Sequence, residues 1–342
     1  MNLGVLGATG VVGEEVLAIL AARSFPIDEL RVFASERSVG RKISTPVGEV
    51  ACMLPTAAAF AGLDLIIVDV EDDLAREWIP VAEAAGAVVI DNSAAFRMEP
   101  GVPLVVAEVN PKDVGARKRN IVSCPNCTTM VLLTALAPLH RITPITRMVV
   151  STYQAVSGAG RAGIAELARQ WEAGVGREVD LGQAGKHPEL ITSGQVWDRP
   201  IAGNVIPRAG SLASDGTTSE EAKLLHESRK ILHAPELRVA ATCVRVPVYV
   251  GHSMSVNVEF SGPLSAAAAV SALSSAPGVL VSDNGTGAPT ALEGAGIDPV
   301  LVGRVRDDLS QANTLNLWVT GDNLRKGAAL NAVQLAEIVV AE

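Results

Sequence analysis

The first half of the chain alternates between short apolar runs and segments with helical periodicity. Two helical patterns, over residues 14–22 and 74–85, separate the runs. The apolar runs cover residues 2–6, 30–33, 63–70 and 87–90. Strands that alternate with helices in this way form a parallel sheet with helices on both faces. We therefore predict a doubly wound α/β domain in this half.

The pattern changes beyond about residue 128. Longer apolar runs with short connections follow, over residues 147–156, 238–250, 253–260 and 315–323. Long strands joined in this way favour an antiparallel or mixed sheet. An amphipathic helix pattern over residues 326–340 closes the chain, and we expect it to pack against the first domain. The prediction is a first domain of residues 1–127 and 322–342 and a second, α+β domain of residues 128–321.

The composition excludes several classes of partner. The 342 residues carry a formal charge of −9, and 48% of them are hydrophobic against 19% charged. Such an acidic chain does not favour binding to nucleic acid or to an anionic membrane, and no apolar run approaches the roughly 20 residues of a membrane span. The four cysteines show no disulfide pattern, which suits a reducing cytosol. We expect a cytoplasmic protein that binds anionic ligands through a few local cations.

The segment Gly7-Ala8-Thr9-Gly10-Val11-Val12-Gly13 lies between the first predicted strand and the first predicted helix. Its spacing, G-x-x-G-x-x-G, is a variant of the dinucleotide-binding fingerprint of Rossmann-type folds, in the required strand–turn–helix context. The glycines permit a tight turn and let a pyrophosphate approach the helix N-terminus. A glycine-rich turn without a ligand is the alternative, and the context favours the nucleotide.

The end of the second predicted strand bears on the choice between NAD and NADP. An acidic residue here typically accepts the ribose 2′-hydroxyl of NAD, whereas arginine binds the 2′-phosphate of NADP. Ser35, Arg37 and Ser38 offer hydroxyls and a planar cation suited to phosphate. Glu36 lies among them and is expected to face solvent. The pattern favours NADP.

A candidate nucleophile lies at the start of a long helical pattern over residues 128–139. Cys127 follows a short apolar strand and a turn, with Asn126 or Thr128 as the expected N-cap. The free N–H groups and the dipole of a helix start favour the thiolate form of a cysteine. Because a thiolate attacks acyl carbon, we interpret Cys127 as a catalytic nucleophile.

The cysteines also fit three roles other than a nucleophile, and all three stay open at this point. Cys124 and Cys127 form a C-x-x-C, which is half of a common zinc site, but Cys52 and Cys243 are isolated and supply no second pair. The pair also resembles a thioredoxin-type dithiol, although that module is shorter than this chain. Alternatively, both are small buried residues, the commonest fate of cysteine. We expect no metal site.

Several charged residues have surroundings typical of ligand binding. Arg97 follows the carboxyl end of a predicted strand, where doubly wound folds bind ligands, although an isolated arginine is more often a surface charge. Arg245 falls inside an apolar strand, and a buried arginine needs a carboxylate or a bound anion. His252 follows a glycine at a strand junction, where a structural histidine is the simpler interpretation. Glu220 and Lys223 share a helix face, most often the mark of a solvated ion pair.

Taken together, these segments resemble the aspartate-β-semialdehyde dehydrogenase family over essentially the whole chain. The E-x-x-K of Glu220 and Lys223 belongs to this resemblance. The other matching motifs, in the family's order, are GATGVVG at 7–13, ASERSVG at 34–40, NSAAFRM at 92–98, CPNCTT at 124–129, STYQAVSGAG at 151–160, CVRVPVYVGHS at 243–253 and GDNLRKGAALNAVQLAE at 321–337.

The resemblance implies a role for each matching residue. Cys127 would form an acyl-thioester, His252 would be the general acid/base, and Gln154 would orient the acyl group. Arg245 and Glu220 would bind the carboxylate and the ammonium of the substrate. Phosphate would be bound by Arg97, Asn126 and Lys223. NADP would be contacted by Gly7, Thr9, Gly10, Val11, Val12, Ser35, Arg37, Ser38, Ser157, Gly158 and Asn323. The family assembles as a homodimer or a tetramer through its second domain.

The implied reaction is the NADPH-dependent reduction of L-aspartyl-4-phosphate to aspartate semialdehyde, with release of inorganic phosphate. It would lead toward diaminopimelate, lysine, methionine and threonine. A related enzyme, N-acetyl-γ-glutamyl-phosphate reductase, would share the fold and the nucleophile, but its substrate has no ammonium for Glu220 to bind. A non-catalytic NADP-binding paralogue would need neither Cys127 nor His252. Cys124 departs from the family pattern, and we hypothesise that oxidation joins it to Cys127 in a disulfide.

Overall fold

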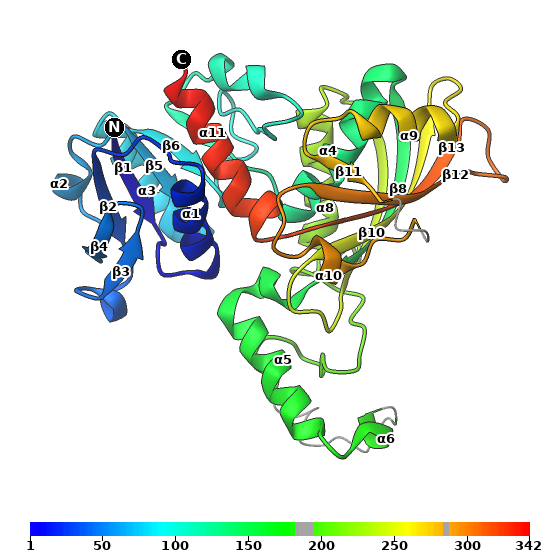
Figure 1. Ribbon diagram of the computed structural model, residues 1–342, viewed down its shortest axis with the longest axis horizontal. Helices are drawn as coiled ribbons and strands as arrows, with labels where there is room; N and C mark the ends of the chain where they lie inside the picture. The colour runs from blue at the N-terminus through cyan, green and yellow to red at the C-terminus, as the bar shows by residue number, and fades with distance from the viewer. Residues whose placement is uncertain (182, 184–193, 283–286) are drawn as a thin grey trace. The chain divides into compact units, whose positions relative to one another are not determined.

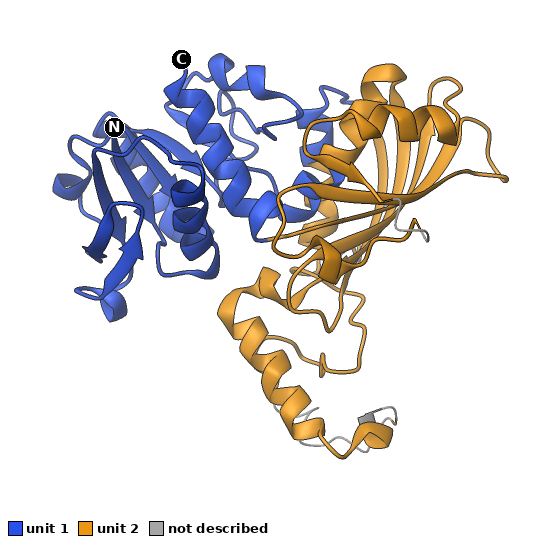
Figure 2. Cartoon of the chain, in the orientation of Figure 1, with its two compact units in different colours: residues 1–133, 227–235, 324–342 blue, residues 134–226, 236–323 orange. Residues whose placement is uncertain are grey.

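The computed structural model describes residues 1–181, 183, 194–282 and 287–342 (Figure 1). The chain forms two compact units, coloured separately in Figure 2. Unit 1 comprises residues 1–133, 227–235 and 324–342, and unit 2 comprises residues 134–226 and 236–323. None of the described helices is both long enough and apolar enough to span a membrane.

Unit 1 contains a five-stranded sheet with the order β2-β1-β5-β6-β7. Every neighbouring pair is parallel, which confirms the predicted doubly wound arrangement. All four residues of β5 are buried, as expected for a central strand covered on both faces. The strands are β1 (Asn2–Leu6), β2 (Glu29–Phe33), β5 (Leu65–Val68), β6 (Val88–Asp91) and β7 (Ile121–Ser123).

Helices cover this sheet, and a separate two-stranded hairpin lies beside β2. The C-terminal helix α11 (Leu330–Val340) packs against α1, β5 and β6, as expected from the sequence (Figure 1). The other helical elements are α1 (Val11–Ala22), η1 (Glu36–Ser38), α2 (Ala57–Phe60), α3 (Asp72–Ala84), η2 (Pro111–Ala116) and α4 (Cys127–Ile142), whose last nine residues belong to unit 2. The hairpin consists of β3 (Lys42–Thr45) and β4 (Gly48–Ala51).

The last helix does not begin as predicted. Residues Arg325–Ala329 form a π-turn, η4, in which the N–H of Ala329 donates to the carbonyl of Leu324 at 2.9 Å. Lys326 is buried in this turn, where its ammonium binds Glu108. An amphipathic pattern places a lysine on the solvent face, so it misses a lysine that a distant carboxylate draws inside.

Unit 2 contains a six-stranded sheet with the order β11-β12-β13-β10-β8-β9. The β8–β9 and β11–β12 pairs are parallel and the other pairs are antiparallel, so the sheet is the mixed one of the two predicted types. Its strands are β8 (Ile145–Gln154), β9 (Arg238–Arg245), β10 (His252–Phe260), β11 (Val279–Val281), β12 (Val300–Asp307) and β13 (Thr314–Gly321).

The described helices of unit 2 include α8, which carries several predicted site residues. Thr218 caps this helix: its hydroxyl accepts from the N–H of Glu221 at 3.3 Å, and the Glu221 carboxylate accepts from the N–H of Thr218 at 2.8 Å. The helix continues into unit 1 from Glu227 onward. The helical elements are η3 (Val156–Ala159), α5 (Gly160–Gly174), α6 (Glu178–Leu181), α8 (Ser219–Ile231), α9 (Ala266–Ser274) and α10 (Ala291–Gly294).

Candidate active site

The glycine-rich turn of unit 1 leaves no space for side chains where β1 meets α1. Gly7 has a φ of 92°, and a Cβ there would lie 2.0 Å from the carbonyl oxygen of Asp69. A Cβ on Gly13 would lie 2.2 Å from the carbonyl oxygen of Gly7. The turn therefore packs tightly beside the start of α1, whose first N–H groups lack partners within the helix. These residues fit a dinucleotide.

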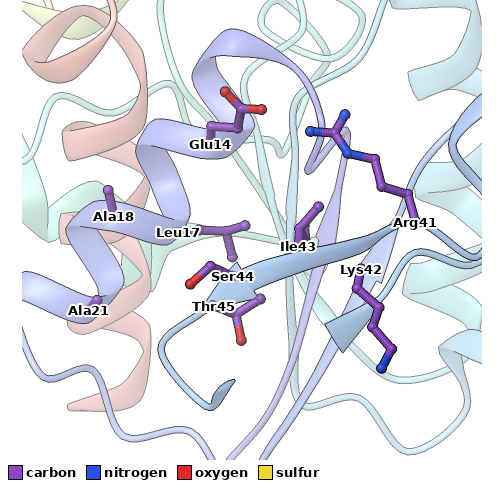
Figure 3. Close-up of a pocket in the computed structure, with 9 residues that line it drawn as sticks. All are labelled: Glu14, Leu17, Ala18, Ala21, Arg41, Lys42, Ile43, Ser44 and Thr45. Atoms are coloured by element: carbon purple, nitrogen blue, oxygen red, sulfur yellow. The ribbon is translucent and has the colours of Figure 1, made fainter. Parts of the chain in front are cut away.

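The segment predicted to bind a 2′-phosphate follows β2. Ser35 and Arg37 are exposed there, and so is Glu36, as expected. A pocket of about 480 Å³ lies nearby between α1 and β3, and in Figure 3 the Arg41 side chain extends toward the end of the pocket where Glu14 lies. The pocket is lined by Glu14, Leu17, Ala18, Ala21, Arg41, Lys42, Ile43, Ser44 and Thr45.

Cys127 is the first residue of α4 and so lies in the first helical turn, where the sequence predicts it. The side-chain oxygen of Asn126 accepts from the N–H of Thr128 at 3.0 Å and also from the Thr128 hydroxyl, so Asn126 is the N-cap. The Cys127 thiol is partly exposed and lies 4.0 Å from the same Asn126 oxygen. The position favours a thiolate, because the dipole of a helix start stabilises negative charge.

Cys124 lies in a different environment. Its side chain is fully buried, and burial raises the pKa of the thiol to about 12, although Asn331 donates to the sulfur at 3.6 Å. No group of three or more metal-ligating side chains occurs among the residues that the structure describes. Cys124 is therefore a packed thiol, and this environment counts against the disulfide hypothesis because exchange requires a thiolate.

Arg97 is not a surface charge, because only 7% of it is exposed. Its Nη1 donates to Glu227 Oε1 at 2.9 Å and its Nη2 donates to the carbonyl of Asn92 at 2.8 Å. Glu227 Oε2 accepts from the N–H of Asn126 at 2.8 Å. One carboxylate thus joins two residues predicted to bind phosphate. Glu227 is not among the residues predicted from the sequence, although it lies seven residues after Glu220 on the same predicted helix face.

Unit 2 brings together the residues predicted to bind the amino acid. Glu220 accepts from Lys223 Nζ at 2.9 Å and from Gln154 Nε2 at 3.2 Å. The Gln154 carbonyl oxygen accepts from the hydroxyl of Thr152 at 3.1 Å, which fixes its orientation. Glu220 is only 9% exposed, so its contact with Lys223 is not a solvated surface pair.

Arg245 and His252 are both held by the main chain of Ala155. Arg245 is the last residue of β9, not a mid-strand residue as predicted, because the strand ends before Pro247, which has no N–H to donate. Its Nη1 donates to the Ala155 carbonyl at 2.6 Å, and His252 Nδ1 accepts from the Ala155 N–H at 3.0 Å. A Cβ on Gly158 would lie 2.9 Å from Arg245 Nη1.

The remaining predicted cofactor residues of unit 2 also contact one another. The Asn323 amide donates to the Ser157 hydroxyl at 2.9 Å, and its oxygen accepts from the N–H of Gly251 at 2.9 Å. Unit 2 therefore places Ser157, Gly158 and Asn323 beside the segment that leads into His252. A similar clustering of predicted residues occurs in unit 1 around Cys127 and Arg97.

Comparisons with known proteins assign the family. The models "Semialdehyde dehydrogenase, NAD binding domain" and "Semialdehyde dehydrogenase, dimerisation domain" match residues 2–116 and 136–326. The chain is 48% identical to an aspartate-semialdehyde dehydrogenase of Streptomyces akiyoshiensis, over 100% of this chain and 99% of that protein. The chain belongs to the aspartate-semialdehyde dehydrogenase family. The predicted family and its nicotinamide-type nucleotide domain are thereby confirmed.

Solved structures of aspartate-semialdehyde dehydrogenase II from Vibrio cholerae agree with this assignment. One has a TM-score of 0.92 at 39% identity, covering 100% of this chain and 98% of that one. Another, complexed with ASA, has a TM-score of 0.90 at 39% identity and the same coverage. The fold of this family member is therefore shared along its full length with structurally known relatives.

The electrostatic environment keeps His252 of this family member neutral. Complete burial, followed by the nearby Arg245, lowers the pKa of His252 from 6.5 to about 3. Because the Ala155 N–H donates to Nδ1, the neutral ring carries its proton on Nε2. His252 can thus donate a hydrogen bond through Nε2 without becoming charged.

This lowered pKa predicts a pH-dependent stability. Below pH 6.5 the unfolded chain takes up a proton at His252 that the native protein does not bind until about pH 3. The free energy of unfolding therefore decreases as the pH is lowered through this window, by up to about 1.4 kcal/mol per pH unit from this residue. Thermal melts between pH 7 and pH 4 should show a shallower loss of stability in His252→Gln than in the parent protein. Parallel curves would contradict the prediction.

A second prediction concerns thiol reactivity. Iodoacetamide should modify Cys127 in the folded protein and leave Cys124 unmodified, because only Cys127 combines exposure with a helix start. Peptide mass spectrometry before and after unfolding measures both sites. Peroxide should likewise give sulfinic acid at Cys127, and detection of a Cys124–Cys127 disulfide would overturn this interpretation of Cys124.

Proposed function

We propose that this protein catalyses the NADPH-dependent reduction of L-aspartyl-4-phosphate to L-aspartate-4-semialdehyde, with release of inorganic phosphate, and the reverse reaction. The observation that carries the proposal is a partly exposed cysteine at a capped helix start, in a family whose relatives are named aspartate-semialdehyde dehydrogenases. The V. cholerae relative complexed with ASA supports the same substrate class.

In this proposal the chain forms and breaks one covalent bond. The Cys127 thiolate attacks the acyl carbon of the substrate, the bond from that carbon to the phosphate oxygen breaks, and a thioester forms. The nicotinamide cofactor supplies the hydride that reduces the thioester. The carbon–sulfur bond then breaks, the aldehyde leaves and Cys127 regains its thiolate. His252 takes the predicted acid/base role as a neutral ring: with its pKa lowered to about 3, it donates through Nε2–H to the oxygen that develops negative charge.

The charged residues would recognise the two ends of the substrate. Arg245 binds its α-carboxylate, Glu220 its ammonium, and Gln154 orients the acyl group. Arg97, Asn126 and Lys223 bind the phosphate. The two cations of the phosphate set already have carboxylate partners in the structure: Glu227 binds Arg97, and Glu220 binds Lys223. These partners set where each cation lies before substrate binds.

We also propose NADP as the cofactor, bound by the glycine-rich turn and, at its 2′-phosphate, by Ser35, Arg37 and Ser38. Arg37→Ala should raise the Kd for NADPH about ten-fold or more and leave the Kd for NADH unchanged, because it removes one charge-assisted contact to the 2′-phosphate. Titration calorimetry measures both constants. Lys42→Ala removes an exposed cation of the same unit from outside the predicted set, and an equal loss in that variant would mean that only general charge is involved.

Self-association as a homodimer or tetramer is part of the proposal, and the matched dimerisation-domain model supports it. A pocket of about 660 Å³ opens on the sheet of unit 2, where the side chains of Tyr153, Trp318 and Arg306 line it. Sedimentation of the purified protein measures the assembly.

The reverse reaction tests the function directly. Aspartate semialdehyde, phosphate and NADP are mixed with the protein, and the absorbance of reduced nicotinamide is followed. Phosphate-dependent NADPH formation is the expected result. Turnover only with N-acetylglutamate semialdehyde would keep the mechanism and change the substrate. Absence of turnover with both substrates, in a protein that still binds NADPH, would indicate a non-catalytic paralogue.

A further inference from the structure

Two side chains of helix α8 bind Arg97, one at its guanidinium and the other at its main-chain carbonyl. Glu227 accepts from the guanidinium at 2.9 Å, and Lys230, three residues later, donates to the main-chain carbonyls of Arg97 at 2.6 Å and of Val102 at 2.9 Å. Both side chains lie on one helix face because residues three apart are neighbours on a helix. The loop that carries Arg97 is thus fixed to α8 through its backbone and through its charged group.

Glu227 also supports the turn of the nucleophile. Its second oxygen accepts from the N–H of Asn126 at 2.8 Å, and Asn126 caps the helix that begins at Cys127. The carboxylate is 2% exposed, so both hydrogen bonds form away from solvent. A buried bond of this kind is strong and directional. Movement of the Glu227 side chain would therefore displace Arg97 and the N-cap of α4 together.

The guanidinium of Arg97 still has a donor to offer. Its Nε is buried and has no hydrogen-bond partner among the residues that the structure describes. Burial alone would lower the pKa of Arg97, but the facing Glu227 carboxylate raises it above its ordinary value. Arg97 is thus a permanent cation. Its Nη1 and Nη2 are held by hydrogen bonds to Glu227 and to the carbonyl of Asn92, and its Nε–H has no acceptor among the described residues. Such a donor is suited to an anionic oxygen.

We propose that Glu227 is a positioning residue that fixes Arg97 and the Cys127 turn in register for one phosphate-bearing substrate. This inference rests on the proposed function, in which Arg97 and Asn126 bind the phosphate. Glu227 itself touches no substrate in this scheme. Its two oxygens hold two different donors, so a single rigid carboxylate sets the spacing between the phosphate cation and the nucleophile.

The chemistry of the site predicts which replacement fails. Glutamine has the shape of glutamate but only one acceptor oxygen, so its NH₂ group must face either Arg97 Nη1 or the N–H of Asn126. Two donors then face each other in a buried position, and one of the held groups moves. Aspartate keeps both acceptors and is shorter by one methylene, so it should restore part of the effect. Glu221→Gln is the matched control, because Glu221 lies on the same helix and its two carboxylate oxygens also accept two hydrogen bonds, from the main-chain N–H groups of Thr218 and Cys243.

The experiment measures protection of Cys127 by inorganic phosphate. The full-length protein is alkylated with iodoacetamide at increasing phosphate concentrations, and the concentration for half protection is compared among the parent, Glu227→Gln, Glu227→Asp and Glu221→Gln. We expect it to rise at least about ten-fold in Glu227→Gln, less in Glu227→Asp, and to stay unchanged in Glu221→Gln. In turnover assays, the KM for phosphate should rise while the KM for aspartate semialdehyde stays constant.

Three outcomes would overturn the inference. Tighter phosphate protection in Glu227→Gln would show that Glu227 merely competes with phosphate for Arg97. Equal effects of Glu227→Gln and Glu221→Gln would show a general structural role. Absence of phosphate protection in the parent protein would show that phosphate does not bind at Arg97 beside Cys127. The proposed function is tested separately, by phosphate-dependent turnover of aspartate semialdehyde in the parent protein. If Glu227→Gln does not fold, the comparison rests on Glu227→Asp, for which a rise is still expected.

Discussion

Replacing Cys127 with serine is expected to lower kcat in the phosphate-dependent oxidation of aspartate semialdehyde by at least about a thousand-fold. The helix start favours a thiolate at this position, but it cannot ionise a serine hydroxyl at neutral pH, so the acyl-enzyme no longer forms. The initial rate of NADPH formation measures the effect.

Two controls accompany this variant. Cys124→Ser should retain most of the turnover, because Cys124 is a buried thiol that contacts Asn331 and takes no part in the proposed chemistry. Cys127→Ser should also bind NADPH with the affinity of the parent protein, since the glycine-rich turn is unchanged. Turnover near the parent rate in Cys127→Ser would exclude Cys127 as the nucleophile.

Replacing Lys326 with methionine is expected to cost about 3–5 kcal/mol of stability. Lys326 is fully buried, and its ammonium binds Glu108, the amide oxygen of Gln334 at 2.9 Å and that of Asn331 at 3.2 Å. Methionine fills a similar volume but removes the ammonium from the Glu108 carboxylate, whose side chain is only 10% exposed. The melting temperature should fall by roughly 10 °C.

The double replacement Lys326→Met with Glu108→Gln is the informative control. It removes both charges and keeps an acceptor for the amide of Gln334, which donates to Glu108 at 2.9 Å. Most of the lost stability should return, because a neutral pair carries no unpaired charge in the interior. A single variant that melts like the parent protein would show that the buried ion pair contributes nothing to stability.

The elements that the sequence predicted well are those set by local pattern. The parallel sheet of unit 1 follows from continuous apolar runs such as 65–68. Such a run is typical of a strand that is buried on both faces of its sheet. The glycine-rich turn follows from positions such as Gly13, where a Cβ would strike the carbonyl oxygen of Gly7. The start of α4 at Cys127 follows from the capping chemistry of Asn126. In each case the decisive neighbours lie close in sequence or share a simple periodicity.

The elements that it predicted badly depend on distant partners. The π-turn at 325–329 accompanies a lysine that binds Glu108, more than two hundred residues earlier in the chain. The exposed or buried state of Arg97 was undecided in the sequence, and Glu227 decides it from 130 residues away. Helical periodicity shows which residues share a face, but it does not show what that face meets.

The sequence by itself determined the family, the fold class and the candidate nucleophile, because these depend on motifs and on residue types at fixed spacings. Only the tertiary structure decided that Cys124 is a buried thiol, that His252 stays neutral, and that Glu227 joins Arg97 to the Cys127 turn. The physical reason is the same for all three. Desolvation and the pairing of buried charges arise from side chains that are remote in sequence and adjacent only after folding.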